Sequence, residues 1–105
     1  MNCESRLMVR TSQGDEVAFR ELYERYKKPI LGFIVLRTRC FEDAEEIFQQ
    51  VFLRVFDKAD RFHPEREVAP WIFTIASNPC KDYARRSRRW TEFLNRRLSR
   101  LVKRH

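Results

Sequence analysis

The chain has 105 residues, 43% of which are hydrophobic, and it carries a formal net charge of +7. This length allows one small domain, and two glycines with four prolines are too few for a turn-rich β protein. No apolar run approaches the ~20 residues that span a bilayer, and the three cysteines have neither disulfide nor zinc-ligand spacing. We therefore predict an all-α fold, a compact bundle of four to five helices with a basic C-terminal extension, in a cytoplasmic protein without metal or cofactor.

The first forty residues predict three helices. The first is short and ends at Gly14, after which Asp15 can cap the second helix. The second has apolar residues at helical spacing, namely Phe19, Leu22, Tyr23 and Tyr26. Pro29 suits the first position of a third helix. The third is apolar nearly all round, so we expect it to be the buried central helix and to end near Cys40.

A fourth helix is predicted over residues 42–59, because Glu42 and Asp43 place negative charge where a helix dipole favours it. At roughly 100° per residue, half of its circumference is apolar and should face the core, with Ala44, Ile47, Phe48, Val51, Phe52, Val55 and Phe56. The other half carries Glu46, Gln49, Gln50, Leu53 and Asp57. Leu53 within this polar strip indicates either a protein-docking face with an apolar anchor or an ordinary solvated face.

Helical periodicity is lost over residues 57–70, which predicts a loop of roughly ten residues that is long enough to suggest a function. A fifth helix then starts at Pro70 or Trp71 and turns Ile72, Ile75, Ala76, Pro79 and Tyr83 inward. Its outward row consists of Trp71, Thr74, Asn78, Lys81 and Arg85. Aromatic, amide and cationic groups in one row suit base stacking, base-edge hydrogen bonding and phosphate contact. Taken alone, Trp71 is better explained as a core residue at a helix start.

Pro79 leaves two possibilities for this helix. It either kinks a continuous helix or ends it, with Asn78 capping a new one, and the apolar stripe that keeps its phase across the proline favours the first. Beyond Arg89, residues 90–105 form a basic amphipathic pattern that is typical of a linker or tail, either mobile or helical.

The net charge lies almost entirely in the last quarter of the chain. Residues 81–105 hold ten Lys or Arg and two carboxylates, whereas residues 1–80 hold twelve Lys or Arg and thirteen Asp or Glu. A near-neutral body followed by a cationic segment is expected of a domain that binds a polyanion along one edge. Nucleic acid is therefore the first candidate partner.

Four stretches of the sequence are informative through their order and spacing: GDEVAFRELYERY (14–26), DAEEIFQQVFLRVF (43–56), DRFHPER (60–66) and WIFTIASN (71–78). Together they resemble region 2 of bacterial sigma-70 factors, most closely the extracytoplasmic-function (ECF) branch. The resemblance implies a helical domain over residues 1–89 and a basic amphipathic linker or tail over 90–105. A full factor of this kind would also carry a helix-turn-helix domain for the minus-35 element, which the 105 residues do not contain.

The resemblance also implies partners and site residues. It implies binding to core RNA polymerase through the clamp helices of its β′ subunit, recognition and melting of the minus-ten promoter element on the non-template strand, and an anti-sigma factor as a further candidate partner. The implied polymerase-binding residues are Glu46, Gln49, Gln50, Leu53 and Phe56, and the position of Asp57 on the same polar strip adds it to this set. The implied DNA-binding residues are Asp60, Arg61, His63 and Arg66 in the loop, then Trp71, Thr74, Asn78 and Lys81. The charge of the C-terminal segment adds Arg85, Arg86, Arg88 and Arg89 to the DNA-binding set.

This sequence departs from the family pattern at several positions. The family usually has Glu where Gln50 stands, an arginine near both Thr74 and Ser77, and an aromatic residue near Val68. Fewer cations at these positions shift phosphate contact toward Lys81 and the arginines that follow it.

Two other functions compete with this interpretation. A basic amphipathic protein could bind an anionic membrane or RNA through residues 85–105, although this leaves the polar strip around Leu53 without a role. An enzyme has less support, because Asp60, His63 and Glu65 share one loop but no nucleophile pair, glycine-rich phosphate loop or metal-ligand set accompanies them. We expect no catalytic residues.

Overall fold

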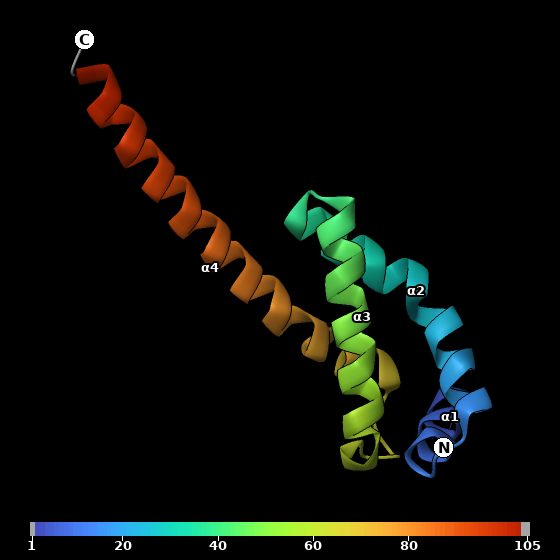
Figure 1. Ribbon diagram of the computed structural model, residues 1–105. Coiled ribbons are helices and arrows are strands. Elements are labelled where there is room, and N and C mark those ends of the chain that lie inside the picture. The colour runs from blue at the N-terminus through green and yellow to red at the C-terminus, as the bar shows by residue number, and fades with distance from the viewer. Residues whose placement is uncertain (1, 104–105) are drawn as a thin grey trace.

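The computed structural model describes residues 2–103, and that part of the chain is helical, without a strand (Figure 1). Its elements are α1 (Cys3–Ser12), α2 (Glu16–Thr38), α3 (Phe41–Lys58), the short 3-10 helix η1 (Ala59–Arg61) and α4 (Val68–Lys103). The all-α prediction is confirmed. None of these helices combines the length and the apolar character that crossing a membrane requires.

The turn between α1 and α2 follows the predicted pattern. Gly14 has φ 89°, a left-handed conformation that glycine adopts without strain, and it turns the chain toward Asp15. The Asp15 carboxylate accepts hydrogen bonds from the backbone N–H groups of Val17 (3.0 Å) and Ala18 (3.1 Å). The Ala18 bond, together with the bond from Arg10, lowers the pKa of the Asp15 carboxyl. The cap of α2 is therefore charged at neutral pH, where it also complements the helix dipole.

Helix α2 corrects the prediction of a boundary at Pro29, because it runs through the proline without a break. A proline inside a helix removes one backbone hydrogen bond and costs about 3 kcal/mol. The apolar stripe keeps a strict four-residue spacing across it and is buried throughout, with Ala18, Leu22, Tyr26, Ile30 and Ile34. Packing of this stripe outweighs the local cost. The expectation of a helix buried all round is also wrong, since Leu36 is 77% exposed.

Helix α3 supplies the middle of the core. Six of its seven predicted core residues are buried, namely Ala44, Ile47, Phe48, Val51, Phe52 and Val55. Phe56 is the exception at 43% exposed, because it lies at the edge of the apolar arc, where no further helix covers it. The rings of Phe48 and Phe52 pack against Tyr23 of α2, with centroids 5.2 Å from it in each case. These contacts fix how α3 is rotated against α2.

Helix α4 starts before its predicted first residue and continues past the core without a break. It begins at Val68, two or three residues before the predicted start. Because η1 also occupies the first part of the expected loop, residues 62–67 are the part of that loop that lies outside helices. The preference for a continuous helix at Pro79 is confirmed, and the proline is buried against the core. The Tyr83 hydroxyl donates to Asp43 (2.8 Å), which raises the pKa of Tyr83 and ties α4 to the start of α3.

The second half of α4 projects away from the other helices, so the two ends of the chain lie far apart (Figure 1). The molecule measures 67 × 21 × 19 Å, and a helix of 36 residues accounts for about 54 Å of that length. The predicted tail over residues 90–105 is thus helical as far as residue 103, and its last two residues lie outside the described part. The division into a domain over 1–89 and a tail stays a prediction.

Candidate protein and nucleic-acid interfaces

The outward side of α3 presents six residues that we call the docking face: Glu46, Gln49, Gln50, Leu53, Phe56 and Asp57. All six are exposed, Leu53 by 66%, and exposure is predicted for five of them, whereas the apolar periodicity places Phe56 toward the core. Gln49 donates a hydrogen bond to the hydroxyl of Tyr23 on α2 (3.2 Å). Leu53 is therefore an exposed apolar side chain surrounded by amide and carboxylate groups.

An apolar hollow of about 540 Å³ adjoins the docking face. Leu53 and Phe56 line it from α3, and Phe19 and Tyr23 line it from α2. The rings of Phe19 and Phe56 meet edge to face with centroids 5.1 Å apart. Phe19 and Tyr23 belong to the apolar residues at helical spacing, and both are only half-buried, because α2 and α3 diverge at this end (Figure 1). The hollow can accept an apolar side chain from a partner.

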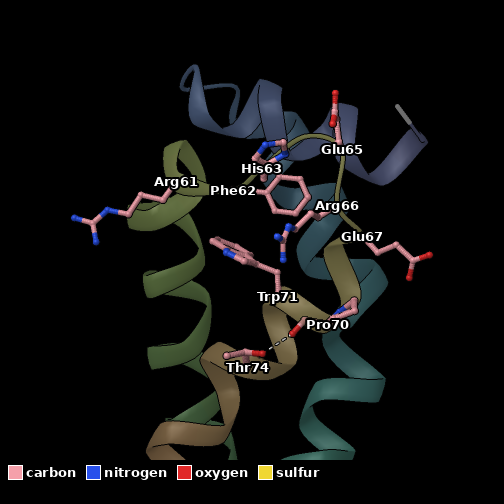
Figure 2. A pocket seen from close by; sticks show the side chains of 9 residues that line it. All are labelled: Arg61, Phe62, His63, Glu65, Arg66, Glu67, Pro70, Trp71 and Thr74. Atoms are coloured by element: carbon pink, nitrogen blue, oxygen red, sulfur yellow. Dashed lines mark hydrogen bonds between the residues drawn. The ribbon is translucent and has the colours of Figure 1, made fainter.

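A larger hollow of about 850 Å³ lies between the loop over residues 62–67 and the start of α4 (Figure 2). Its floor is aromatic, with Phe62 and Trp71 packed edge to face at 5.5 Å between centroids. Figure 2 shows the Arg66 side chain directed between these two rings, whereas Glu65 and Glu67 point outward. The buried hydroxyl of Ser5 donates to the backbone carbonyl of Arg66 (3.2 Å) and so holds the loop against α1.

The predicted loop residues divide between two positions. Arg61, His63 and Arg66 line the hollow, whereas Asp60 is exposed on η1 and does not line it. The prediction that Trp71 points outward is wrong in part, because its side chain is half-buried against Phe62. The ring still lines the hollow, so it combines the core role and the surface role that were posed as alternatives.

The rest of the predicted row is exposed on α4, with Thr74, Asn78, Lys81 and Arg85, followed by Arg86, Arg88 and Arg89. The Thr74 hydroxyl donates to the backbone carbonyl of Pro70 (2.8 Å; Figure 2) and keeps its lone pairs for an incoming donor. Arg85 pairs with Asp82 on the same helix. Because the helix is continuous, Asn78 does not cap a new one, and its amide stays at the surface.

A groove of about 290 Å³ runs between the end of α3 and this row, and sequence reasoning missed two of its three cations, Arg54 and Lys58. Arg54, Lys58 and Arg61 line one side, and Trp71, Thr74 and Asn78 line the other. Arg54 and Lys58 lie four residues apart and so share one face of α3. This spacing is the signal in the sequence that could have identified them. Near Thr74 this sequence lacks an arginine that the family pattern usually has. Arg54 and Lys58 supply positive charge to the same groove from α3.

The buried titratable groups of the described region are structural. Burial raises the pKa of the Cys80 thiol, so it stays protonated at neutral pH, and burial likewise raises the pKa of Tyr26. Within residues 2–103 no group of three or more His, Cys, Asp or Glu could hold a metal ion. The side chains that line the two DNA-side cavities offer stacking, hydrogen bonding and charge.

Comparison with known proteins places this geometry in context. Residues 22–91 match the family described as Sigma-70 region 2. The chain is 32% identical over 89 residues to the RNA polymerase sigma factor CarQ of Myxococcus xanthus, covering 85% of this chain and 51% of that protein. It is 41% identical over 75 residues to the ECF RNA polymerase sigma factor RpoE of Cereibacter sphaeroides, covering 70% and 41%.

A further relative is the ECF RNA polymerase sigma factor SigW of Bacillus subtilis, 29% identical over 76 residues, covering 72% of this chain and 41% of that protein. The chain thus spans about half the length of these relatives, or somewhat less. No solved structure matches it.

Proposed function

The chain belongs to the ECF branch of the sigma-70 family, in its region 2, and from this membership we propose that it serves transcription initiation as a sigma factor domain. In this role it binds core RNA polymerase and recognises and melts the minus-ten element of a promoter. It works in the cytoplasm and has no catalytic chemistry of its own. The observation that carries the proposal is that α3 takes part in two surfaces, because Leu53 lines an apolar hollow and the next residue, Arg54, lines a cationic and aromatic groove.

The docking face is the surface that we assign to the clamp helices of the β′ subunit. An apolar centre within a polar rim is the usual anatomy of a protein interface, and Leu53 with the adjoining hollow supplies that centre. Gln49 and Gln50 offer hydrogen bonds around it without a charge that would have to be desolvated.

The loop hollow and the row on α4 are the surfaces that we assign to promoter DNA. A base turned out of the helix can enter the 850 Å³ hollow, stack on Trp71 and meet the guanidinium of Arg66. Arg54, Lys58 and Arg61 stand where they can contact the backbone phosphates beside that base. Thr74 and Asn78 supply the polar groups for base edges.

Melting then follows from differential binding. Unstacking and unpairing a base costs a few kcal/mol, and stacking on an aromatic side chain returns about 1–3 kcal/mol per base. A few such contacts, made only with the opened strand, shift the equilibrium toward the open form.

Replacement of Trp71 by alanine is expected to weaken binding of a promoter-like non-template single strand by about 1–3 kcal/mol, measured by fluorescence anisotropy with core polymerase present. Trp71→Phe keeps an aromatic face and should retain most of the affinity. Thermal unfolding of both variants separates lost stacking on DNA from lost packing on Phe62. Equal binding of the unchanged chain to random duplex without polymerase would contradict the proposal.

Replacement of Leu53 by alanine is expected to weaken association with core polymerase by about 1–2 kcal/mol, with folding nearly intact, because the side chain is exposed. Leu36→Ala is the matched control, as it alters a leucine on α2 that is at least as exposed and lies outside the docking face. Pull-down or interferometry with core polymerase measures both variants. Equal losses for the two would rule out a specific docking face.

A further inference from the structure

The projecting half of α4 carries an apolar face that nothing in the described chain covers. Every residue from 84 to 102 is exposed. Six large apolar side chains on this segment are between 39% and 72% exposed: Trp90, Phe93, Leu94, Leu98, Leu101 and Val102. Figure 1 shows the segment projecting away from α2 and α3.

This face continues the stripe by which α4 packs into the core. Ile72, Ala76, Pro79 and Tyr83 lie at spacings of three and four residues, and the series resumes with Trp90, Leu94, Leu98 and Leu101 in the same phase. The first part of the stripe has α2 and α3 as partners, and the second part has none within residues 2–103. An apolar face of this size on a projecting helix indicates an interaction surface.

The charge on the same segment restricts what can cover it. Residues 84–102 hold seven arginines and one carboxylate, Glu92. Two copies of so cationic a helix would repel each other if their apolar faces met, whereas a polyanionic surface would attract them.

The width of the apolar face restricts the partner further. Its six side chains occupy about half of the helix circumference, wider than the narrow seam that a single partner helix covers. The Trp90 and Phe93 rings stack at 5.6 Å, and the Arg97 guanidinium lies within the apolar arc, 5.6 Å from the Phe93 centroid. In a protein groove that arginine would be buried, whereas at a lipid headgroup layer its charged end can reach the phosphates while its stem stays among apolar groups.

We propose that residues 84–102 form a peripheral binding surface for an anionic lipid bilayer, with the helix lying in the headgroup plane. A large apolar face of Trp, Phe and Leu, a strongly basic opposite face and a low net hydrophobicity are the features of helices that bind in this way. The apolar face is separate from the docking face and the loop hollow, but the segment includes four arginines that the proposed function assigns to DNA, namely Arg85, Arg86, Arg88 and Arg89. The test therefore targets apolar side chains beyond Arg89, so that its failure and the failure of the proposed function are distinguishable.

Co-sedimentation of the full chain with vesicles tests the proposal. Vesicles that mix phosphatidylglycerol with phosphatidylcholine should bind the chain, pure phosphatidylcholine vesicles should bind it at least about tenfold less, and salt should weaken the binding. Leu98→Gln with Leu101→Gln should lower the partition coefficient at least about tenfold, because two exposed apolar anchors are lost while helix propensity is kept. Val17→Gln with Leu36→Gln, two exposed sites on α2, is the matched control and should bind like the unchanged chain.

A spectroscopic readout follows the same contact. The chain has two tryptophans, so Trp71→Phe leaves Trp90 as the sole indole, and its emission should shift to the blue with anionic vesicles alone. Equal binding to both kinds of vesicle, or unchanged binding of the Leu98/Leu101 variant, would overturn the proposal. So would a concentration-dependent dimer in analytical ultracentrifugation that this variant abolishes, because the face would then belong to a second copy.

Discussion

Replacement of Phe52 by alanine is expected to lower the free energy of unfolding by about 3–5 kcal/mol. The ring is almost completely buried, and it packs against Phe48 (5.0 Å between centroids), Tyr23 (5.2 Å) and Phe19 (6.2 Å). Its removal leaves a cavity where α2 and α3 meet, and neither helix can close it without losing its other contacts. A domain of this size has a total stability of only about 5–15 kcal/mol, so partial unfolding is expected. Urea denaturation followed by circular dichroism measures the change.

The neighbouring residue provides the control for this prediction. Leu53 lies on the same helix turn but is 66% exposed, so Leu53→Ala should leave the urea midpoint nearly unchanged. Phe52→Leu retains most of the buried volume and keeps the comparison measurable if the alanine variant does not fold. Similar losses for Phe52→Ala and Leu53→Ala would mean that α3 is rotated differently about its axis, and the docking face would then be assigned wrongly.

The sequence is most informative where one helix has two sharply different sides. On α3, apolar periodicity alone identifies six buried residues and the exposure of Leu53. It fails at Pro29, because the local signal of a proline competes with the packing of a buried stripe that spans it, and packing wins. The early start of α4 at Val68 has the same origin, since Val68 is itself buried in the core.

The candidate site is less predictable, because its cavities form between helices. The exposed row on α4 follows from periodicity, whereas the groove that brings Arg54 and Lys58 opposite Asn78 depends on how α3 and α4 are packed. Likewise, the separation of α2 from α3 decides that Phe19 and Tyr23 border a hollow. A single sequence records which residues share a face, but it does not record the distance between two faces.

Neutralisation of Lys81, Arg88 and Arg89 by glutamine is expected to reduce the salt dependence of promoter binding. Each phosphate contact contributes about 0.9 to the slope of log affinity against log salt concentration, so loss of three contacts lowers the slope by roughly two to three. The three residues are exposed on α4 beyond Asn78, in the row that we propose to contact DNA. Arg85 is left in place because it pairs with Asp82. Anisotropy of promoter DNA with core polymerase and the chain, titrated from about 50 to 200 mM salt, measures the slope.

A second triple variant separates position from charge. Arg96→Gln, Arg97→Gln and Arg100→Gln removes the same net charge from the same helix, but its sites begin about two turns beyond Arg89. Long-range attraction would be reduced similarly in both variants, whereas direct phosphate contact is lost only where the cations reach the backbone. The first variant should therefore lose clearly more slope than the second. A cation that contacts a phosphate releases counterions, whereas a distant cation does not. Equal slopes for the two variants would therefore mean that the DNA binds elsewhere and that the row on α4 is a solvated face.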